Sequence, residues 1–171
     1  FCGKEKIYMA GFSLILIGSN QGQRELIISQ SIKMLAERCG EVLLLSSLYE
    51  TEPWGFIAEQ NFLNQVVALD TEKNPYDLLR ELLMIEKELG RKRHEVEGYE
   101  SRPIDLDILY YDDKIINDTD LILPHPRLHK RRFALMPLCD IAADFIHPVF
   151  KRSNRELLNE CEDTSEVKLY K

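Results

Sequence analysis

The sequence predicts an α+β fold, in which a ferredoxin-like antiparallel sheet with flanking helices forms a three-layer α/β/α sandwich. Apolar patterns follow the order strand–helix–strand–strand–helix–strand, which is the order of that fold. The length of 171 residues suits one domain with a sizeable hydrophobic core, and no internal repeat or linker divides it. We therefore expect a single domain over residues 12–171. Residues 1–11 are expected to be an N-terminal extension or an expression remnant, with Met9 as a candidate natural start.

The first half of the chain supplies three strands and one helix. The run "FSLILIGSN" at residues 12–20 predicts a buried strand that ends in a Gly-Ser-Asn turn. Apolar residues at helical spacing predict a helix over 22–39, and Gly40 lies just past its end. Residues 42–51 are predicted as a second strand. Residues 62–71, after a Pro/Gly loop, are predicted as a third strand that pairs with it.

The second helix has the clearest local signals. Asn74 suits its N-cap, Pro75 its first helical position and Gly90 its end. Glu86 lies in the last turn, where the helix dipole disfavours an acid, so this residue is either an ordinary surface acid or is held by a ligand. The remaining expected elements are a strand at about 104–111, a short hairpin through "DDKI", and helices near 132–142 and 153–160.

The composition limits the classes of function. A formal net charge of −7 disfavours a general nucleic-acid-binding protein, because neutralising phosphates requires a basic face. No apolar run approaches the roughly 20 residues of a membrane span, and no signal-peptide pattern is present, so a cytoplasmic protein is expected. The four cysteines form no CxxC pair, which argues against a zinc ribbon, and they are expected to be reduced.

Two dense basic clusters interrupt this acidic chain. They are "RKRH" at residues 91–94 and "HPRLHKRR" at residues 125–132. Either cluster alone could be a solvated surface run. Because they flank a strand that carries paired aspartates, together they indicate a pocket for a polyanion.

Asp105 and Asp107 are the strongest candidates for chemistry. Alternate residues of a strand share a face, so these two carboxylates point the same way about 6.5–7 Å apart along the backbone. Carboxylates at that spacing can converge on one or two Mg²⁺ ions, whose other ligands are commonly water and substrate phosphates. Arg102 suits a phosphate oxygen nearby. The alternative is a strand with one wet face.

Three classes of function fit these residues. The first is a kinase or pyrophosphokinase for a small molecule, which would be of neither the P-loop nor the protein-kinase type because both phosphate loops are missing. The second is a Mg²⁺-dependent nucleotidyltransferase, although Gly18 and Asp105 lie farther apart than that class prefers. The third is a non-catalytic, acidic nucleotide-binding domain.

Six motifs in order resemble the 6-hydroxymethyl-7,8-dihydropterin pyrophosphokinase family over nearly the whole chain from Phe12 to about Leu158. They are "YETEPWG" (49–55), "QNFLN" (60–64), "IEKELGRKR" (85–93), "SRPIDLDILYY" (101–111), "LPHPRL" (123–128) and "RRFALMPL" (131–138). The resemblance implies transfer of the β,γ-pyrophosphate of ATP to the pterin hydroxymethyl group in folate biosynthesis. It also implies a monomer with small-molecule substrates and without a nucleic-acid or membrane partner.

By this resemblance, Asp105 and Asp107 are the ligands of two Mg²⁺ ions, and Arg91 and Arg102 are catalytic. The implied nucleotide contacts are Glu86, Arg93, Tyr99, Arg102, Ile108, His125 and Arg131. The implied pterin contacts are Thr51, Pro53, Trp54, Phe62, Asn64, Asp105 and Phe133. The chemistry is consistent, since a flat bicyclic ring stacks between aromatic faces and an amide pairs with its polar edge. Phe62 and Phe133 could otherwise be ordinary core residues.

The sequence departs from the family pattern in three places. Glu100 and Ser101 replace a Gly-Pro pair before the second arginine, and Tyr99 stands where the family often has tryptophan. Pro126 replaces an aromatic residue after the histidine. The segment from Arg91 to Ser101 is expected to close over ATP, so these changes affect closure and ATP affinity rather than the reaction.

Overall fold

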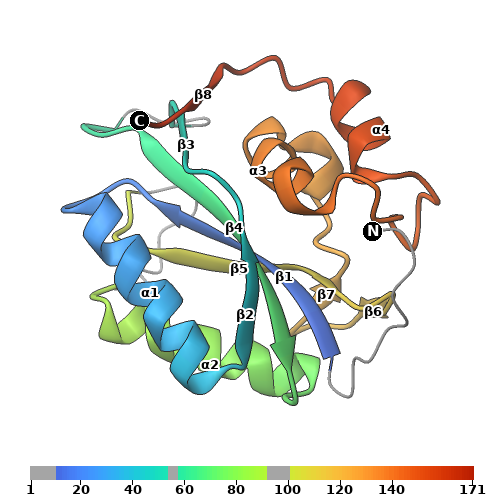
Figure 1. Ribbon diagram of the computed structural model, residues 1–171, viewed down its shortest axis with the longest axis horizontal. Coiled ribbons are helices and arrows are strands. Elements are labelled where there is room, and N and C mark those ends of the chain that lie inside the picture. The colour runs from blue at the N-terminus through green and yellow to red at the C-terminus, as the bar shows by residue number, and fades with distance from the viewer. Residues whose placement is uncertain (1–10, 54–57, 92–100) are drawn as a thin grey trace.

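A computed structural model describes residues 11–53, 58–91 and 101–171 of the protein (Figure 1). These residues form an α+β fold, in which helices surround a six-stranded antiparallel sheet. The sheet has the strand order β5-β1-β4-β3-β8, and β2 also pairs with β4. Within the same described residues, no helix is long and apolar enough to cross a membrane.

β1 (Gly11–Ser19) lies inside the sheet, where it pairs with β4 (Phe62–Thr71) on one side and with β5 (Asp105–Tyr111) on the other. The last two residues of β1, Gly18 and Ser19, lie at the end of the sheet where β5, the strand that carries the two aspartates, begins. Gly18 lies opposite Asn64 on one side and opposite Asp105 on the other. The three predicted strands at 12–20, 62–71 and 104–111 are thus confirmed, with ends shifted by one residue at most.

The strand predicted over residues 42–51 is wrong as one element, because it forms β2 (Glu41–Leu45) and β3 (Tyr49–Thr51). Both pair with β4, as the sequence analysis expected of the whole segment. The break falls at two serines. The Ser46 hydroxyl accepts the Val66 N–H at 2.9 Å, and the Ser47 N–H turns to the Asp140 carboxylate at 3.0 Å. Side chains thereby replace the regular strand ladder.

Two further strand features were not predicted correctly. β8 (Val167–Leu169), which adds an edge strand beside β3, was missed because three residues carry no period. The hairpin expected at "DDKI" lies farther on, between β6 (Ile116–Asn117) and β7 (Ile122–Leu123). The Asp118 carboxylate accepts the N–H groups of Asp120 and Leu121, each at 3.0 Å, and so closes that turn.

Helices cover both faces of the sheet (Figure 1). α1 (Arg24–Arg38) and α2 (Pro75–Glu88) lie on one face, and α3 (Arg132–Ala142) and α4 (Asn154–Asn159) lie on the other. A short 3-10 helix, Leu128–Lys130, leads into α3.

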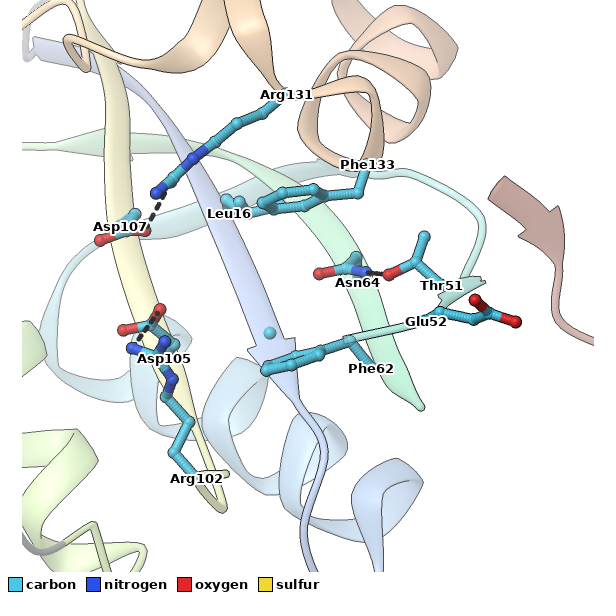
Figure 2. Close-up of a pocket in the computed structure, with 11 residues that line it drawn as sticks. Leu16, Thr51, Glu52, Phe62, Asn64, Arg102, Asp105, Asp107, Arg131 and Phe133 are labelled. Carbon is cyan, nitrogen blue, oxygen red and sulfur yellow. Dashed lines mark hydrogen bonds and ion pairs between the residues drawn. The ribbon is translucent and has the colours of Figure 1, made fainter. Parts of the chain in front are cut away.

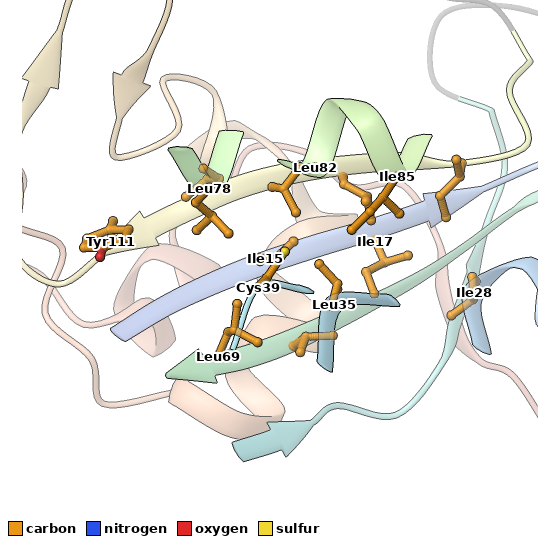
Figure 3. Packing of buried hydrophobic residues seen from close by; sticks show 14 of the residues in the cluster. Ile15, Ile17, Ile28, Leu35, Cys39, Leu69, Leu78, Leu82, Ile85 and Tyr111 are labelled. Carbon is orange, nitrogen blue, oxygen red and sulfur yellow. The ribbon is translucent and has the colours of Figure 1, made fainter. Parts of the chain in front are cut away.

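Each face has its own hydrophobic core, because strand residues alternate between the two. In β1, Ile15 and Ile17 join the core under α1 and α2, whereas Leu14 and Leu16 join the core under α3 and α4. Figure 3 shows the first core, where Leu78, Leu82 and Ile85 of α2 pack onto the sheet.

The ends of α2 confirm the capping prediction. The Asn74 side chain accepts the N–H groups of Tyr76 and Asp77, each at 3.0 Å, and Pro75 is the first helical residue. Gly90 follows with a φ of 94°, a conformation that favours glycine. These signals are local, so the sequence alone could place this helix.

His147 predicts a pH dependence of stability. Burial, and secondarily the charge of His129, lower its pKa from 6.5 to about 4, while its Nδ1 accepts the N–H groups of Val149 and Phe150. The unfolded chain then binds more protons between pH 6.5 and 4. The free energy of unfolding should therefore fall as the pH drops through this window, by about 1 kcal/mol from this residue once solvent screening reduces the effect of the pKa shift.

The measurement is urea unfolding of the wild type and of His147→Asn from pH 7.5 to 4. Asn keeps a side-chain acceptor but does not titrate, so the difference between the two curves should shrink as the pH falls. A difference that is constant with pH would contradict the assignment.

Candidate active site

A pocket opens on the α3 face of the sheet, near the end of β1 (Figure 2). Strands supply its floor, and the start of α3 supplies one wall. Its lining residues are Leu16, Gly18, Thr51, Glu52, Phe62, Asn64, Arg102, Asp105, Asp107, Arg131 and Phe133. Eight of these belong to the sets that the sequence analysis predicted, so the fold brings most of the predicted site together.

Strand alternation sends the two aspartates into this pocket. Ile104, Leu106 and Ile108 are buried in the core under α1 and α2, as predicted, so Asp105 and Asp107 point to the opposite face. Asp107 lies opposite Leu16 of β1 and Asp105 lies opposite Gly18. β1 therefore presents a small or an apolar residue beside each of the two acids.

Because Gly18 has no side chain, the pocket has free space above β1 at this position. A Cβ atom built there would lie 3.5 Å from Asn64 Oδ1 and 3.9 Å from both Phe62 Cδ1 and the Asp105 Cβ. Those are ordinary van der Waals contacts, so the fold could accept a methyl group. The absence of a side chain instead leaves space among the three pocket residues.

Asp105 lies between two arginines. Its Oδ1 accepts a hydrogen bond from Arg91 Nη1, and its Oδ2 lies 3.1 Å from Arg102 Nη1. All three side chains are largely enclosed, with at most 24% of any of them exposed. Within this enclosure their attraction is weakly screened.

Asp107 has a looser environment of positive charge. Its Oδ2 lies 3.9 Å from Arg131 Nη1 and 4.0 Å from His125 Nε2. Loss of hydration, and then the charge of Asp105, raise the pKa of Asp107 to about 7 despite Arg131. Within the described residues, the basic groups beside Asp107 thus lie at the limit of ion-pair distance, and a weakly paired carboxylate of this kind is a suitable ligand for a cation.

His125 is neutral at physiological pH. Burial, together with the charges of Arg131 and Arg127, lowers its pKa to about 4. Its Nδ1 accepts the Arg127 N–H at 3.2 Å, and its Nε2 lies 3.5 Å from Arg131 Nη1 and 4.0 Å from Asp107 Oδ2. The Nε2 side of the ring therefore faces the charged groups of the pocket.

Glu86, which is unexpected near a helix C-terminus, is a buried structural acid. Only 2% of the residue is exposed, its Oε1 accepts the Leu106 N–H at 2.8 Å, and the same oxygen pairs with Arg91 Nη1 at 2.6 Å. Glu86 therefore links α2 to β5 and orients Arg91 toward Asp105. Its predicted contact with a nucleotide remains a prediction.

Asn20 is a site residue that the sequence analysis missed. Its Oδ1 accepts the Arg102 N–H at 2.8 Å, its Nδ2 donates to Ser101 Oγ at 3.1 Å, and its own N–H donates to the Arg102 carbonyl at 3.2 Å. This buried amide fixes Arg102 to the end of β1. The available signal was the position of Asn20 directly after the Gly-Ser turn.

The apolar side of the pocket is a slot between aromatic rings. Figure 2 shows the rings of Phe62, from β4, and Phe133, from α3, on opposite sides of the space beside Asn64. The Asn64 Nδ2 donates to Thr51 Oγ1 at 2.9 Å, and this bond fixes the orientation of the amide. Arg131 lies over the Phe133 ring, 5.5 Å from its centroid.

Some predicted site residues are not in this pocket. The Ile108 side chain is 5% exposed and packs in the opposite core, so a ligand contact from this residue would come from its main chain. Pro53 is half-buried beside the lining residues. Trp54, Arg93 and Tyr99, together with most of the segment expected to close over ATP, lie outside the described residues.

The donor set fits a divalent cation that is shared with a ligand. In the described part of the chain, no group of three or more His, Cys, Asp or Glu side chains could hold a metal alone. Two carboxylates face one pocket, however, and Mg²⁺ is commonly held by one or two carboxylates plus substrate phosphates and water. Arg91, Arg102 and Arg131 supply the positive charge that such phosphates need.

The fold and site define a class of protein: an α+β domain with a pocket in which paired carboxylates and arginines lie beside a slot between two aromatic rings. The family model described as 7,8-dihydro-6-hydroxymethylpterin-pyrophosphokinase matches residues 14–143. The chain belongs to this family.

Curated relatives agree with this assignment. The 2-amino-4-hydroxy-6-hydroxymethyldihydropteridine pyrophosphokinase of Porphyromonas gingivalis is 46% identical over 134 residues, covering 77% of this chain and 90% of the relative. The enzyme of the same name from Bacillus subtilis is 40% identical over 134 residues, covering 78% of this chain and 79% of the relative. A folic acid synthesis protein of Pneumocystis carinii is 45% identical over 135 residues, which are 79% of this chain but 18% of that protein.

Solved structures show the same fold. A structure titled as HPPK-DHPS in complex with substrates matches with a TM-score of 0.72 and 16% identity, covering 88% of this chain and 43% of that one. A Plasmodium falciparum HPPK-DHPS triple mutant matches with a TM-score of 0.71 and 17% identity, covering 91% and 45%. The chain spans less than half the length of these two structures.

The buried Glu86–Arg91 pair predicts a stability effect that is separate from catalysis. Arg91→Met leaves the Glu86 carboxylate without this partner, so it should lower the free energy of unfolding by about 3 kcal/mol. Adding Glu86→Gln removes the buried charge but keeps an acceptor for the Leu106 N–H, and should recover much of that loss.

Urea unfolding of the two single variants and the double variant measures this coupling. The matched control is Arg38→Met, which breaks the more exposed pair with Glu88 and should cost much less than Arg91→Met, because water screens exposed charges. Equal effects of Arg91→Met and Arg38→Met, or additive effects of the Arg91 and Glu86 changes, would contradict the structural role.

Proposed function

We propose that this protein transfers the β,γ-pyrophosphoryl group of ATP to the hydroxymethyl group of 6-hydroxymethyl-7,8-dihydropterin, giving AMP and the pterin diphosphate in folate biosynthesis. Membership of the family supports the reaction. The observation that carries the proposal is local: Asp105 and Asp107 share one pocket with arginines and with a slot between Phe62 and Phe133.

We assign the slot to the pterin. A flat bicyclic ring between Phe62 and Phe133 would have aromatic faces above and below it. Asn64 and Thr51, already joined by a hydrogen bond, would present polar atoms to the edge of the ring. Gly18 leaves room for the ring on the strand beneath. In this orientation the hydroxymethyl group would point toward Asp105.

We assign the charged side of the pocket to the triphosphate. Asp105 and Asp107 would hold two Mg²⁺ ions, which would supply charge neutralisation at the attacking and leaving oxygens. Arg91 and Arg102 would contact the transferred group, and Arg131 and His125 would contact the nucleotide phosphates. Glu86, Arg93, Tyr99 and Ile108 remain proposed nucleotide contacts.

The reaction that this arrangement favours is a direct in-line displacement. The pterin alcohol oxygen forms a bond to the β-phosphorus, the bond between that phosphorus and the oxygen bridging to the α-phosphate breaks, AMP leaves, and the alcohol proton is released. The protein holds the two substrates in line and balances the charge, so no covalent intermediate with the chain is needed.

Finer structural assignments belong to the same proposal. The strand order and the helices on both faces support a ferredoxin-like, three-layer α/β/α classification, with residues 12–171 as a single domain. We also propose that the protein acts as a monomer, without a nucleic-acid or membrane partner.

Product analysis tests the function. The protein is incubated with ATP, Mg²⁺ and the pterin alcohol, and the nucleotides are separated. Pterin-dependent AMP without free pyrophosphate is the expected result. ADP would indicate ordinary phosphoryl transfer, and free pyrophosphate would indicate nucleotidyl transfer, so either would contradict the proposal.

The Asp107→Ala variant ties the activity to this pocket. Loss of one of the two proposed metal ligands should reduce AMP formation by about a thousandfold or more, because charge neutralisation at the transferred group is lost. Circular dichroism should show that the variant is folded. Near-normal AMP formation by the folded variant would remove Asp107 from the proposed site.

A further inference from the structure

β3 (Tyr49–Thr51) is a short strand that carries one of the proposed pterin contacts. It is three residues long, and its last residue, Thr51, faces the proposed pterin slot and holds the Asn64 amide. A ladder of three residues offers few main-chain hydrogen bonds for fixing a side chain. The contacts around β3 show which other groups hold it in place.

On the pocket face, α3 holds β3 through Asp140. The Tyr49 hydroxyl donates to Asp140 Oδ1 at 2.8 Å, and the Ser47 N–H donates to Asp140 Oδ2 at 3.0 Å. Burial and this hydrogen bond raise the pKa of Tyr49 to about 12, so the hydroxyl remains a donor at physiological pH. The helix that carries Phe133 is thus bonded to the strand that carries Thr51.

On the opposite face, Arg24 of α1 links β3 to the segment that leads into β4. Its Nη1 lies 2.9 Å from Glu50 Oε1 and donates to the Asn61 carbonyl at 2.7 Å. Glu50 directly precedes Thr51, and Asn61 directly precedes Phe62. One guanidinium group therefore contacts the residue next to each of two proposed pterin residues, Thr51 and Phe62.

The C-terminal strand completes the environment of this guanidinium. β8 pairs with the outer edge of β3, and the Tyr170 N–H donates to the Leu48 carbonyl at 2.9 Å. The Tyr170 ring lies under Arg24, with the guanidinium carbon 5.7 Å from the ring centroid. The Arg24 side chain is consequently 17% exposed.

The location of Arg24 has no explanation in the helix itself. It is the first residue of α1, where the helix dipole disfavours a positive charge. Transferring the charge of Arg24 from water into a mostly buried position also costs free energy, unless protein groups replace the lost water contacts. Those groups are Glu50, the Asn61 carbonyl and the Tyr170 ring. Glu50 and Asn61 each precede a residue of the slot, and Tyr170 follows the strand that pairs with β3.

We propose that Arg24 is a positioning residue for the pterin slot. It holds the end of β3 against the start of β4, and so sets the relative placement of Thr51 and Phe62 without touching the substrate. This inference rests on the proposed function for its substrate, but the local order that it predicts does not depend on that function.

The main test compares Arg24→Met with Arg38→Met. Both variants remove an arginine of α1 from a carboxylate partner, but Arg38 pairs with Glu88 at the far end of the helix. For Arg24→Met we expect the KM for the pterin to rise about five- to tenfold, because a small misplacement of binding groups is costly. The KM for ATP should change less than twofold, and Arg38→Met should change neither value.

A conservative variant separates positioning from general loss of stability. One Arg24 nitrogen, Nη1, contacts both Glu50 and the Asn61 carbonyl. Arg24→Lys keeps a cationic donor for these partners but loses the planar group over the Tyr170 ring, so it should recover part of the pterin KM. Equal rises in both KM values, or the same rise in Arg38→Met, would overturn the proposal. If Arg24→Met does not fold, Glu50→Gln is measured in the same way, and an unchanged pterin KM would overturn it.

Hydrogen exchange gives a readout that is independent of activity. The amides of Glu50, Thr51 and Leu63 should exchange faster in Arg24→Met than in the wild type, while those of α2 should not. Unchanged exchange at these amides would overturn the inference even if the enzyme is active. Faster exchange in Arg24→Met, found together with a wild-type protein that makes no AMP, would support the positioning role and count against the proposed function alone.

Discussion

The register of β1 against its two neighbouring strands is the constraint on which the pocket depends. Gly18 lies opposite Asn64 of β4 and opposite Asp105 of β5 in the same row of the sheet. Two residues earlier, Leu16 lies opposite Asp107. Because side chains alternate along a strand, a slip of one residue would send the aspartates into the core under α1 and α2. The buried isoleucines and leucines that flank them make such a slip costly.

Charge balance is the second organising feature. Glu86, Asp105 and Asp107 lie close together at the edge of an apolar core, and Arg91, Arg102 and Arg131 are distributed among them. Asp105 has close arginine partners, whereas the basic atoms that lie nearest to Asp107 within residues 11–53, 58–91 and 101–171 are about 4 Å away. Among the described residues, Asp105 is therefore the more closely paired of the two acids, and Asp107 is the one that we propose a ligand completes. Loss of hydration, followed by the charge of Asp105, raises the pKa of Asp107, and Arg131 and Arg102 offset this only in part.

Features with local or periodic signals could be predicted from the sequence. The α2 caps follow from Asn74, Pro75 and Gly90, and the facing of Asp105 and Asp107 follows from the period of the strand. The family motifs identified most of the pocket lining. What sequence reasoning missed depends on contacts between distant residues.

The missed features illustrate this limit in physical terms. The break between β2 and β3 depends on Asp140, which is 93 residues from Ser47. Asn20 holds the Arg102 N–H across 82 residues, and Arg24 reaches Asn61 across 37. No local pattern marks such partners, since each is an ordinary polar residue until the sheet has formed. β8 is similar, because its three residues become a strand through pairing with β3.

The most direct test of the central claim is anomalous X-ray diffraction from crystals that contain the protein, Mn²⁺, a non-hydrolysable ATP analogue and the pterin alcohol. The account predicts manganese peaks within bonding distance of the Asp105 and Asp107 carboxylates, with the pterin ring between Phe62 and Phe133. Manganese bound away from both aspartates, or a pterin ring outside that slot, would contradict it.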